Sequence, residues 1–113
     1  MSQTDTAWME KHLKGIRTLL GRWQGGRARV WAFQAAHCQL TLRIERYGER
    51  GNLHIICLEP EFIHGPVQWE GCAFEVSRET DKADGGYVLR DPGADFEVKI
   101  GEIEVKENCK PLA

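Results

Sequence analysis

The sequence lacks the long apolar runs of a membrane protein and the charge excess of a polyanion binder. No apolar run approaches the roughly 18 residues that a membrane-spanning helix needs. The net charge is −2 and the pI is about 6.1, whereas basic nucleic-acid-binding domains usually exceed a pI of about 9. Repeats, low-complexity segments and a domain linker are missing too, so 113 residues indicate a single domain without a membrane partner.

Short motifs with a known chemistry are also missing. No Cys-x2-Cys or His-Glu-x2-His spacing marks a metal site, and no glycine-rich loop precedes a helix to hold a phosphate. The sequence therefore predicts neither a metal nor a cofactor. It names no catalytic residue, and whether the chain is an enzyme stays open.

The four cysteines are interpreted as free thiols. The first residues are polar and acidic and no apolar segment follows them, so we expect no secretory signal and a cytoplasmic, reducing location. Cys38, Cys57 and Cys72 fall within apolar strand patterns, where a thiol behaves as a small hydrophobic side chain. We expect these three to be buried and Cys109, in a polar tail, to be exposed.

Apolar periodicity predicts one helix at the start of the chain. Met9, Leu13, Ile16 and Leu20 are spaced by 4, 3 and 4 residues, which is one face of a helix over 6–20. Trp8 widens this face and is expected in the core.

Beyond residue 27 the apolar period falls to two, the period of a strand. Strands are predicted over 28–34, 38–46, 52–59, 67–77, 87–90 and 96–105. The alternation changes phase at Gly71 and at Gly101, which we interpret as two β-bulges. The connection 59–66 contains two prolines and is predicted to be irregular.

The order of these elements predicts an α+β fold. No second helix separates the strands, so parallel βαβ units are excluded. We predict an N-terminal helix packed on a twisted, mostly antiparallel sheet of about six strands, which can curl toward a barrel. One domain spans 1–113, with frayed ends at 1–5 and 107–113.

The strand over 52–59 suggests the function, because it is apolar on both faces. Leu53, Ile55 and Cys57 are assigned to the core, and the opposite face then needs a cover of its own. We therefore predict a non-catalytic interaction module that self-associates as a homodimer through Ile56, Leu58 and Trp31. The basic first half and acidic second half of the chain suit a self-complementary interface.

The alternative is a small-molecule-binding protein or an enzyme, with a cavity between the helix and a curved sheet. Carboxylates and imidazoles transfer protons, and tryptophans often line pockets. The residues expected near the mouth of this cavity are His54, Glu59, Glu61, His64 and Trp69.

Nucleic acid is the less favoured partner. Basic and aromatic residues alternate over 22–31, which is the composition of a surface that stacks single strands. The acidic second half of the chain opposes binding to a polyanion.

Overall fold

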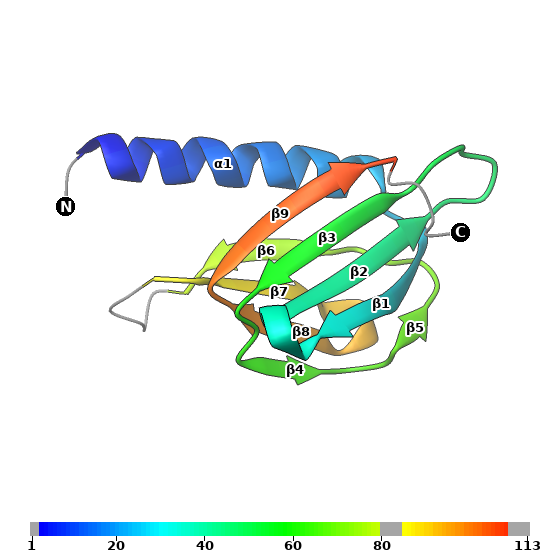
Figure 1. Ribbon diagram of the computed structural model, residues 1–113. Coiled ribbons are helices and arrows are strands. Elements are labelled where there is room, and N and C mark those ends of the chain that lie inside the picture. Colours follow the sequence, from blue (N-terminus) through cyan, green and yellow to red (C-terminus); the bar gives the residue numbers. More distant parts are fainter. Residues whose placement is uncertain (1–2, 80–84, 109–113) are drawn as a thin grey trace.

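The protein contains one helix followed by two antiparallel sheets (Figure 1). The structure, a computed structural model, describes residues 3–79 and 85–108, with side chains from residue 7 onward. Helix α1 spans Gln3–Arg22 and so extends beyond the predicted range at both ends. Within the described ranges, no helix has the length and apolar character needed to cross a membrane. The predicted α+β class is confirmed.

The strands form two open sheets rather than one. The first sheet has the order β5-β1-β2-β3-β9 and contains β5 (Gln68–Trp69), β1 (Arg27–Gln34), β2 (Gln39–Glu45), β3 (Leu53–Leu58) and β9 (Glu102–Glu107). The second has the order β4-β8-β7-β6 and contains β4 (Phe62–His64), β8 (Phe96–Ile100), β7 (Tyr87–Asp91) and β6 (Glu75–Arg78). The prediction of one barrel-like sheet of about six strands is therefore wrong.

The two phase changes interpreted as bulges are crossings between the sheets. Gly71 separates β5 from β6, and Gly101 separates β8 from β9, so each lies where the chain leaves one sheet for the other. Two sheets that face each other enclose the core from opposite sides, so a strand that crosses over must reverse the face that carries its apolar residues. A bulge does occur in β1, where its register with β2 shifts between Val30 and Ala32.

The connection predicted to be irregular contains a short strand. Strand β4 pairs with β8 along one side and forms the edge of the second sheet. Pro60 and Pro66 flank this strand rather than interrupt it, so no ladder hydrogen bond is lost to a proline.

The core lies between the facing sheets, with one side of α1 packed against it. Leu53, Ile55 and Cys57 are completely buried, as predicted. Cys38 is exposed, contrary to expectation, because it follows a 3-10 turn at the tip of the β1–β2 hairpin. Trp8 is 57% exposed, so its prediction as a core residue is also wrong. Cys109 and the tail over 109–113 lie outside the described residues.

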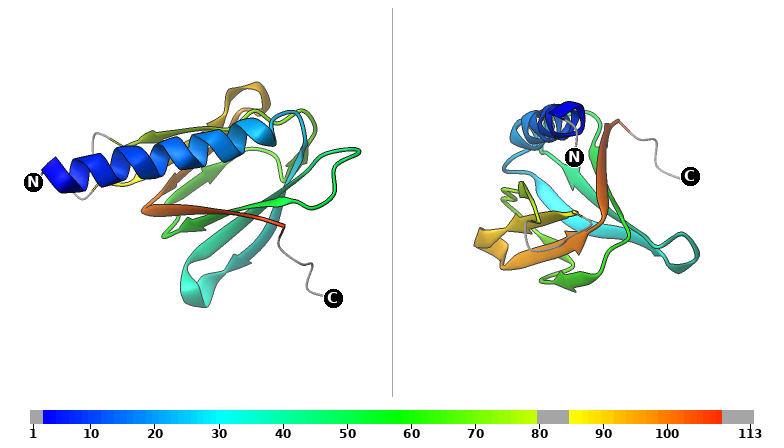
Figure 2. Two further views of the ribbon diagram at one scale, coloured as in Figure 1. Left: turned by 90° about the horizontal axis from the view of Figure 1, so that it is seen from above. Right: turned by 90° about the vertical axis from the view of Figure 1, so that its left-hand side faces the viewer.

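Helix α1 covers one edge of each sheet, β9 of the first and β6 of the second (Figure 2). His12 Nε2 donates to the carbonyl oxygen of Ile103 on β9 at 3.0 Å. The Arg17 guanidinium donates to the carbonyl oxygen of Val76 on β6 at 3.0 and 3.2 Å. These contacts occupy acceptors that an edge strand would otherwise expose. The edges β4 and β5 lie on the side of the molecule away from α1 (Figure 1).

Candidate functional site

The first sheet turns one face toward the core and the other outward, and we call the second the outer face. Its side chains come from β1, β2, β3 and β9, since directly paired residues of neighbouring strands point to the same side. They include Arg29, Trp31, Thr41, Arg43, Glu45, His54, Ile56, Leu58, Glu104 and Lys106. No helix or other strand of the described chain lies in front of this face (Figure 1).

A row of basic side chains crosses the outer face. Arg29 pairs with Arg43, Arg43 with His54, and His54 with Lys106, so the four lie directly opposite one another on adjacent strands. Neighbouring strands are about 4.8 Å apart, and like charges directly opposite each other destabilise a sheet. We call these four residues the basic row.

Trp31 lies beside the basic row because of the bulge in β1. The extra residue at the register shift places the indole on the outer face. The Arg43 guanidinium lies 4.5 Å from the centre of this ring, and that of Arg29 lies 5.9 Å from it. The His54 ring is 6.3 Å away. The indole therefore contributes cation–π attraction and holds the Arg43 guanidinium in place.

The two arginines share one carboxylate. Glu45 Oε1 is 3.4 Å from Arg43 Nε and 3.7 Å from Arg29 Nη2, distances beyond those of good hydrogen bonds. The Nε atoms of both arginines are buried without a hydrogen-bond partner. The Arg43 side chain is only 9% exposed. The guanidinium groups therefore keep hydrogen-bonding capacity that the protein does not use.

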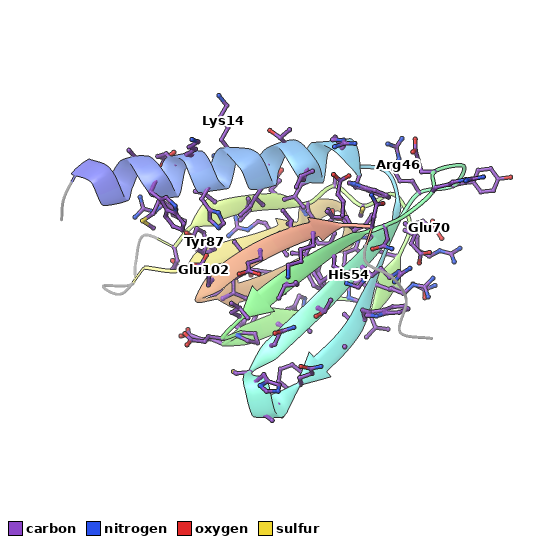
Figure 3. The ribbon with its side chains drawn as sticks, turned by 45° about the horizontal axis from the view of Figure 1, so that its top comes forward. Lys14, Arg46, His54, Glu70, Tyr87 and Glu102 are labelled. Carbon is purple, nitrogen blue, oxygen red and sulfur yellow. The ribbon has the colours of Figure 1, made fainter. Side chains whose placement is uncertain are left out.

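His54 is the third member of this row and is labelled in Figure 3, and its surroundings favour the neutral imidazole. Burial lowers the pKa of its imidazole, the charge of Arg43 lowers it further, and Glu45 opposes them. Its Nε2 atom lies 3.3 Å from Arg43 Nη1, which is a donor, so Nε2 is the acceptor.

The residues predicted to line a cavity lie in three separate parts of the fold. His54 is on the outer face, whereas Trp69 is half-buried and packs against the core, with its ring 4.7 Å from that of Phe96. The Trp69 Nε1–H donates to Asp91 Oδ2 at 2.7 Å, so this indole is part of the structural framework.

The other three predicted residues lie where β3 leads into β4. The Glu59 N–H donates to the carbonyl oxygen of Cys38, and the Glu61 N–H donates to that of Lys99. His64 is exposed and lies 3.1 Å from an Asp95 carboxylate oxygen. Glu59, Glu61 and His64 thus remain close along the chain but follow the far end of β3, whereas His54 lies near its start.

The predicted interface residues share the outer face. Ile56 lies between Thr41 and Glu104, and Leu58 lies between two polar neighbours, so both are half-buried by adjacent side chains. Trp31 is 38% exposed. This face is more polar than expected and presents a small apolar area.

Four further large apolar side chains are exposed in β1, in β4 and just before β5. Phe33 is 60% exposed, Phe62 47%, Ile63 50% and Val67 73%. Phe33 and Ile63 belong to inward-facing rows, because they pair with Leu40 and Val98, yet both remain accessible. We call Phe33, Phe62, Ile63 and Val67 the apolar edge. It was not predicted, because Phe33 and Val67 were assigned to two separate strands and Phe62 and Ile63 to the irregular connection 59–66.

A hollow of about 310 Å³ lies between α1 and the sheets. It is lined by Trp8, Met9, Gly85, Gly86, Tyr87, Gly101 and Glu102. Burial raises the pKa of the Tyr87 hydroxyl, and the nearby Glu102 adds to this effect. Both residues lie below the helix in Figure 3. No sequence spacing joins Trp8 to Tyr87, so the sequence analysis did not find this site.

Comparison of the chain with models of protein families, with curated proteins and with solved structures gives no match.

Proposed function

We propose that this protein is a non-catalytic interaction module that self-associates as a homodimer through its apolar edge. The observation that carries the proposal is the exposure of four large apolar side chains, between 47% and 73%, on the side that α1 leaves open. Several large apolar side chains exposed on one side of a protein often mark an interface.

The size of the apolar edge suits the core of a dimer interface. A fully exposed aromatic side chain presents about 150–250 Å², so the four residues expose on the order of 400 Å². A standard interface buries about 800 Å² on each partner, with an apolar core and a polar rim. The apolar edge can therefore supply the core of such an interface.

The charged residues beside the apolar edge favour a second copy of the chain as the partner. The groups beside the apolar edge carry both signs, since Lys99 lies 5.8 Å from the Phe62 ring and Asp95 pairs with His64. A twofold axis places a surface against itself, so a mixed rim can pair its own opposite charges. The net charge of −2 adds little repulsion between copies.

The outer face, with Ile56, Leu58 and Trp31, is the alternative surface for the same dimer. Its apolar residues are more covered than those of the apolar edge, so it offers less apolar area.

Sedimentation equilibrium over a dilution series tests the proposal. We expect a concentration-dependent dimer, and we expect Ile63→Lys with Val67→Lys to weaken it at least about tenfold, because charge would enter the interface core. Trp8→Lys is the control, since Trp8 is a comparably exposed aromatic residue on α1, away from the apolar edge. A wild-type protein that is monomeric at several hundred micromolar would reject self-association. Loss of the dimer in Ile56→Lys but not in the Ile63 and Val67 variant would assign the interface to the outer face instead.

The hollow beside α1 supports a second candidate function, the binding of a small molecule. It lies between helix and sheet, where the sequence analysis expected a cavity, but its lining differs from the residues predicted there. Because Trp8 lines it, tryptophan fluorescence should change on titration with a ligand from a metabolite panel. The same titration of Trp8→Phe should lose that change, and a panel without any saturable response would remove this candidate.

A further inference from the structure

We propose that the basic row binds a small oxyanion, a phosphate or carboxylate group, between the guanidinium groups of Arg29 and Arg43. This site lies on the outer face, away from the apolar edge, and does not depend on the proposed homodimer.

The first argument is electrostatic. Arg29 and Arg43 lie directly opposite each other on β1 and β2, and two like charges in this position cost stability. Both arginines lie within 4 Å of the same carboxylate, that of Glu45. The protein thus places one carboxylate beside two guanidinium groups, and a bound anion would add the second negative charge.

Second, the guanidinium N–H donors of Arg43 and Arg29 are already held in place before an anion binds. Arg43 is nine-tenths buried and its guanidinium is held over the Trp31 ring, so little side-chain entropy remains to be lost on binding. Its Nε and that of Arg29 have no hydrogen-bond partner. Guanidinium groups bind carboxylates and phosphates through paired N–H donors, and the 31% exposure of the Arg29 side chain leaves this site open to solvent.

The third argument is that an oxyanion already fits between the two arginines. The Glu45 carboxylate occupies that position at distances of 3.4 and 3.7 Å. The Glu45 side chain is 43% exposed, so it can rotate toward solvent when a ligand enters. Glu45 therefore acts as a competitor for the site, and its removal should strengthen binding.

Titration with inorganic phosphate and with succinate, at constant ionic strength set with chloride, tests the site. The side-chain Nε–H signals of the arginines in a ¹⁵N NMR spectrum report the location of binding, and tryptophan fluorescence reports the affinity. We expect saturable binding in the millimolar range for at least one probe, with shifts of the Arg29 and Arg43 signals. Tighter binding of phosphate would identify a phosphorylated ligand, and tighter binding of succinate a carboxylate.

Three variants distinguish this site from general ion effects. Arg29→Gln should weaken binding about tenfold, and Glu45→Gln should strengthen it several-fold. Arg90→Gln is the control, because Arg90 is an ion-paired and more exposed arginine on the second sheet, and it should leave the affinity unchanged. Far-UV circular dichroism checks that each variant is folded.

Four results would overturn the proposal. The first is the absence of a saturable NMR shift with either phosphate or succinate up to on the order of 50 mM. The second is an equal loss of affinity in Arg29→Gln and Arg90→Gln, and the third is weaker binding in Glu45→Gln. The fourth is a set of NMR shifts confined to arginines other than Arg29 and Arg43.

Discussion

The buried carboxylate of Asp91 should contribute a large part of the stability of this fold. Asp91 is 2% exposed, and its Oδ2 accepts from the Trp69 Nε1–H at 2.7 Å and from the Ala73 N–H at 3.0 Å. It thereby connects the end of β7 in the second sheet with β5 and the crossing segment that follows it. A hydrogen bond to a charged group contributes about 1.5–3 kcal/mol, and a buried donor left without a partner costs about 1–3 kcal/mol.

We expect Asp91→Ala to lower the free energy of unfolding by about 2–4 kcal/mol, allowing for the partial exposure of both donor residues. Asp91→Asn keeps an acceptor oxygen without the charge and should cost about 1 kcal/mol. Domains of this kind have a total stability of about 5–15 kcal/mol, so the alanine variant should be measurably weakened in urea unfolding followed by circular dichroism.

A double-mutant cycle with Trp69→Phe isolates the bond to the indole. That variant removes the Nε1–H donor while it keeps an aromatic ring against Phe96. The two substitutions should be coupled by about 1–2 kcal/mol. The reasoning is refuted if Asp91→Ala stays within about 0.5 kcal/mol of the wild type, or if the coupling is indistinguishable from zero.

Three further predictions concern the space around two glycines, the burial of the Cys57 thiol and the lowered pKa of the His54 imidazole. Gly15→Ala should raise the stability by about 0.5–1 kcal/mol because nothing lies within 4 Å of the added methyl group, whereas Gly26→Ala should lower it because the methyl would lie 2.6 Å from the Glu45 carbonyl oxygen. Urea unfolding measures both, and equal signs would contradict the packing. Burial raises the pKa of the Cys57 thiol to about 12, so iodoacetamide at pH 8 should label Cys38 in the native protein and Cys57 only on unfolding. Peptide mass spectrometry checks this, and early labelling of Cys57 would be inconsistent with the buried thiol. Because the folded protein lowers the pKa of His54 below its unfolded value of 6.5, the unfolded state binds the proton more tightly, and stability should fall as the pH drops through about 6.5. His54→Gln should flatten that part of the stability curve, and an unchanged slope would count against the shift.

The charge and apolar patterns of single strands were predictable, because they depend on neighbours two residues apart. The alternation over β2 and β3 assigned Leu53, Ile55 and Cys57 correctly to the core. The 3.6-residue period likewise placed Leu13, Ile16 and Leu20 on the buried side of α1. These assignments needed no knowledge of which strand pairs with which.

The division into two sheets depended on contacts that the local pattern does not contain. A change of phase at Gly71 or Gly101 is produced equally by a bulge in one strand and by a crossing between two sheets. Which one occurs is decided by the pairing of β6 with β7 and of β9 with β3, and the residues of β9 and β3 are distant in the sequence. The short edge strand β4 was missed for the same reason, since its pairing with β8 outweighs its proline-flanked sequence.

The candidate sites belong entirely to the tertiary structure. The basic row joins β1, β2, β3 and β9 from both ends of the chain, and a slip of one residue in any pairing would turn part of it toward the core. The sequence by itself determined the helix, the strand faces and the α+β class through short-range periodicity. The register between strands and the packing of α1 over two of the four sheet edges decided which charges meet and which apolar side chains remain exposed.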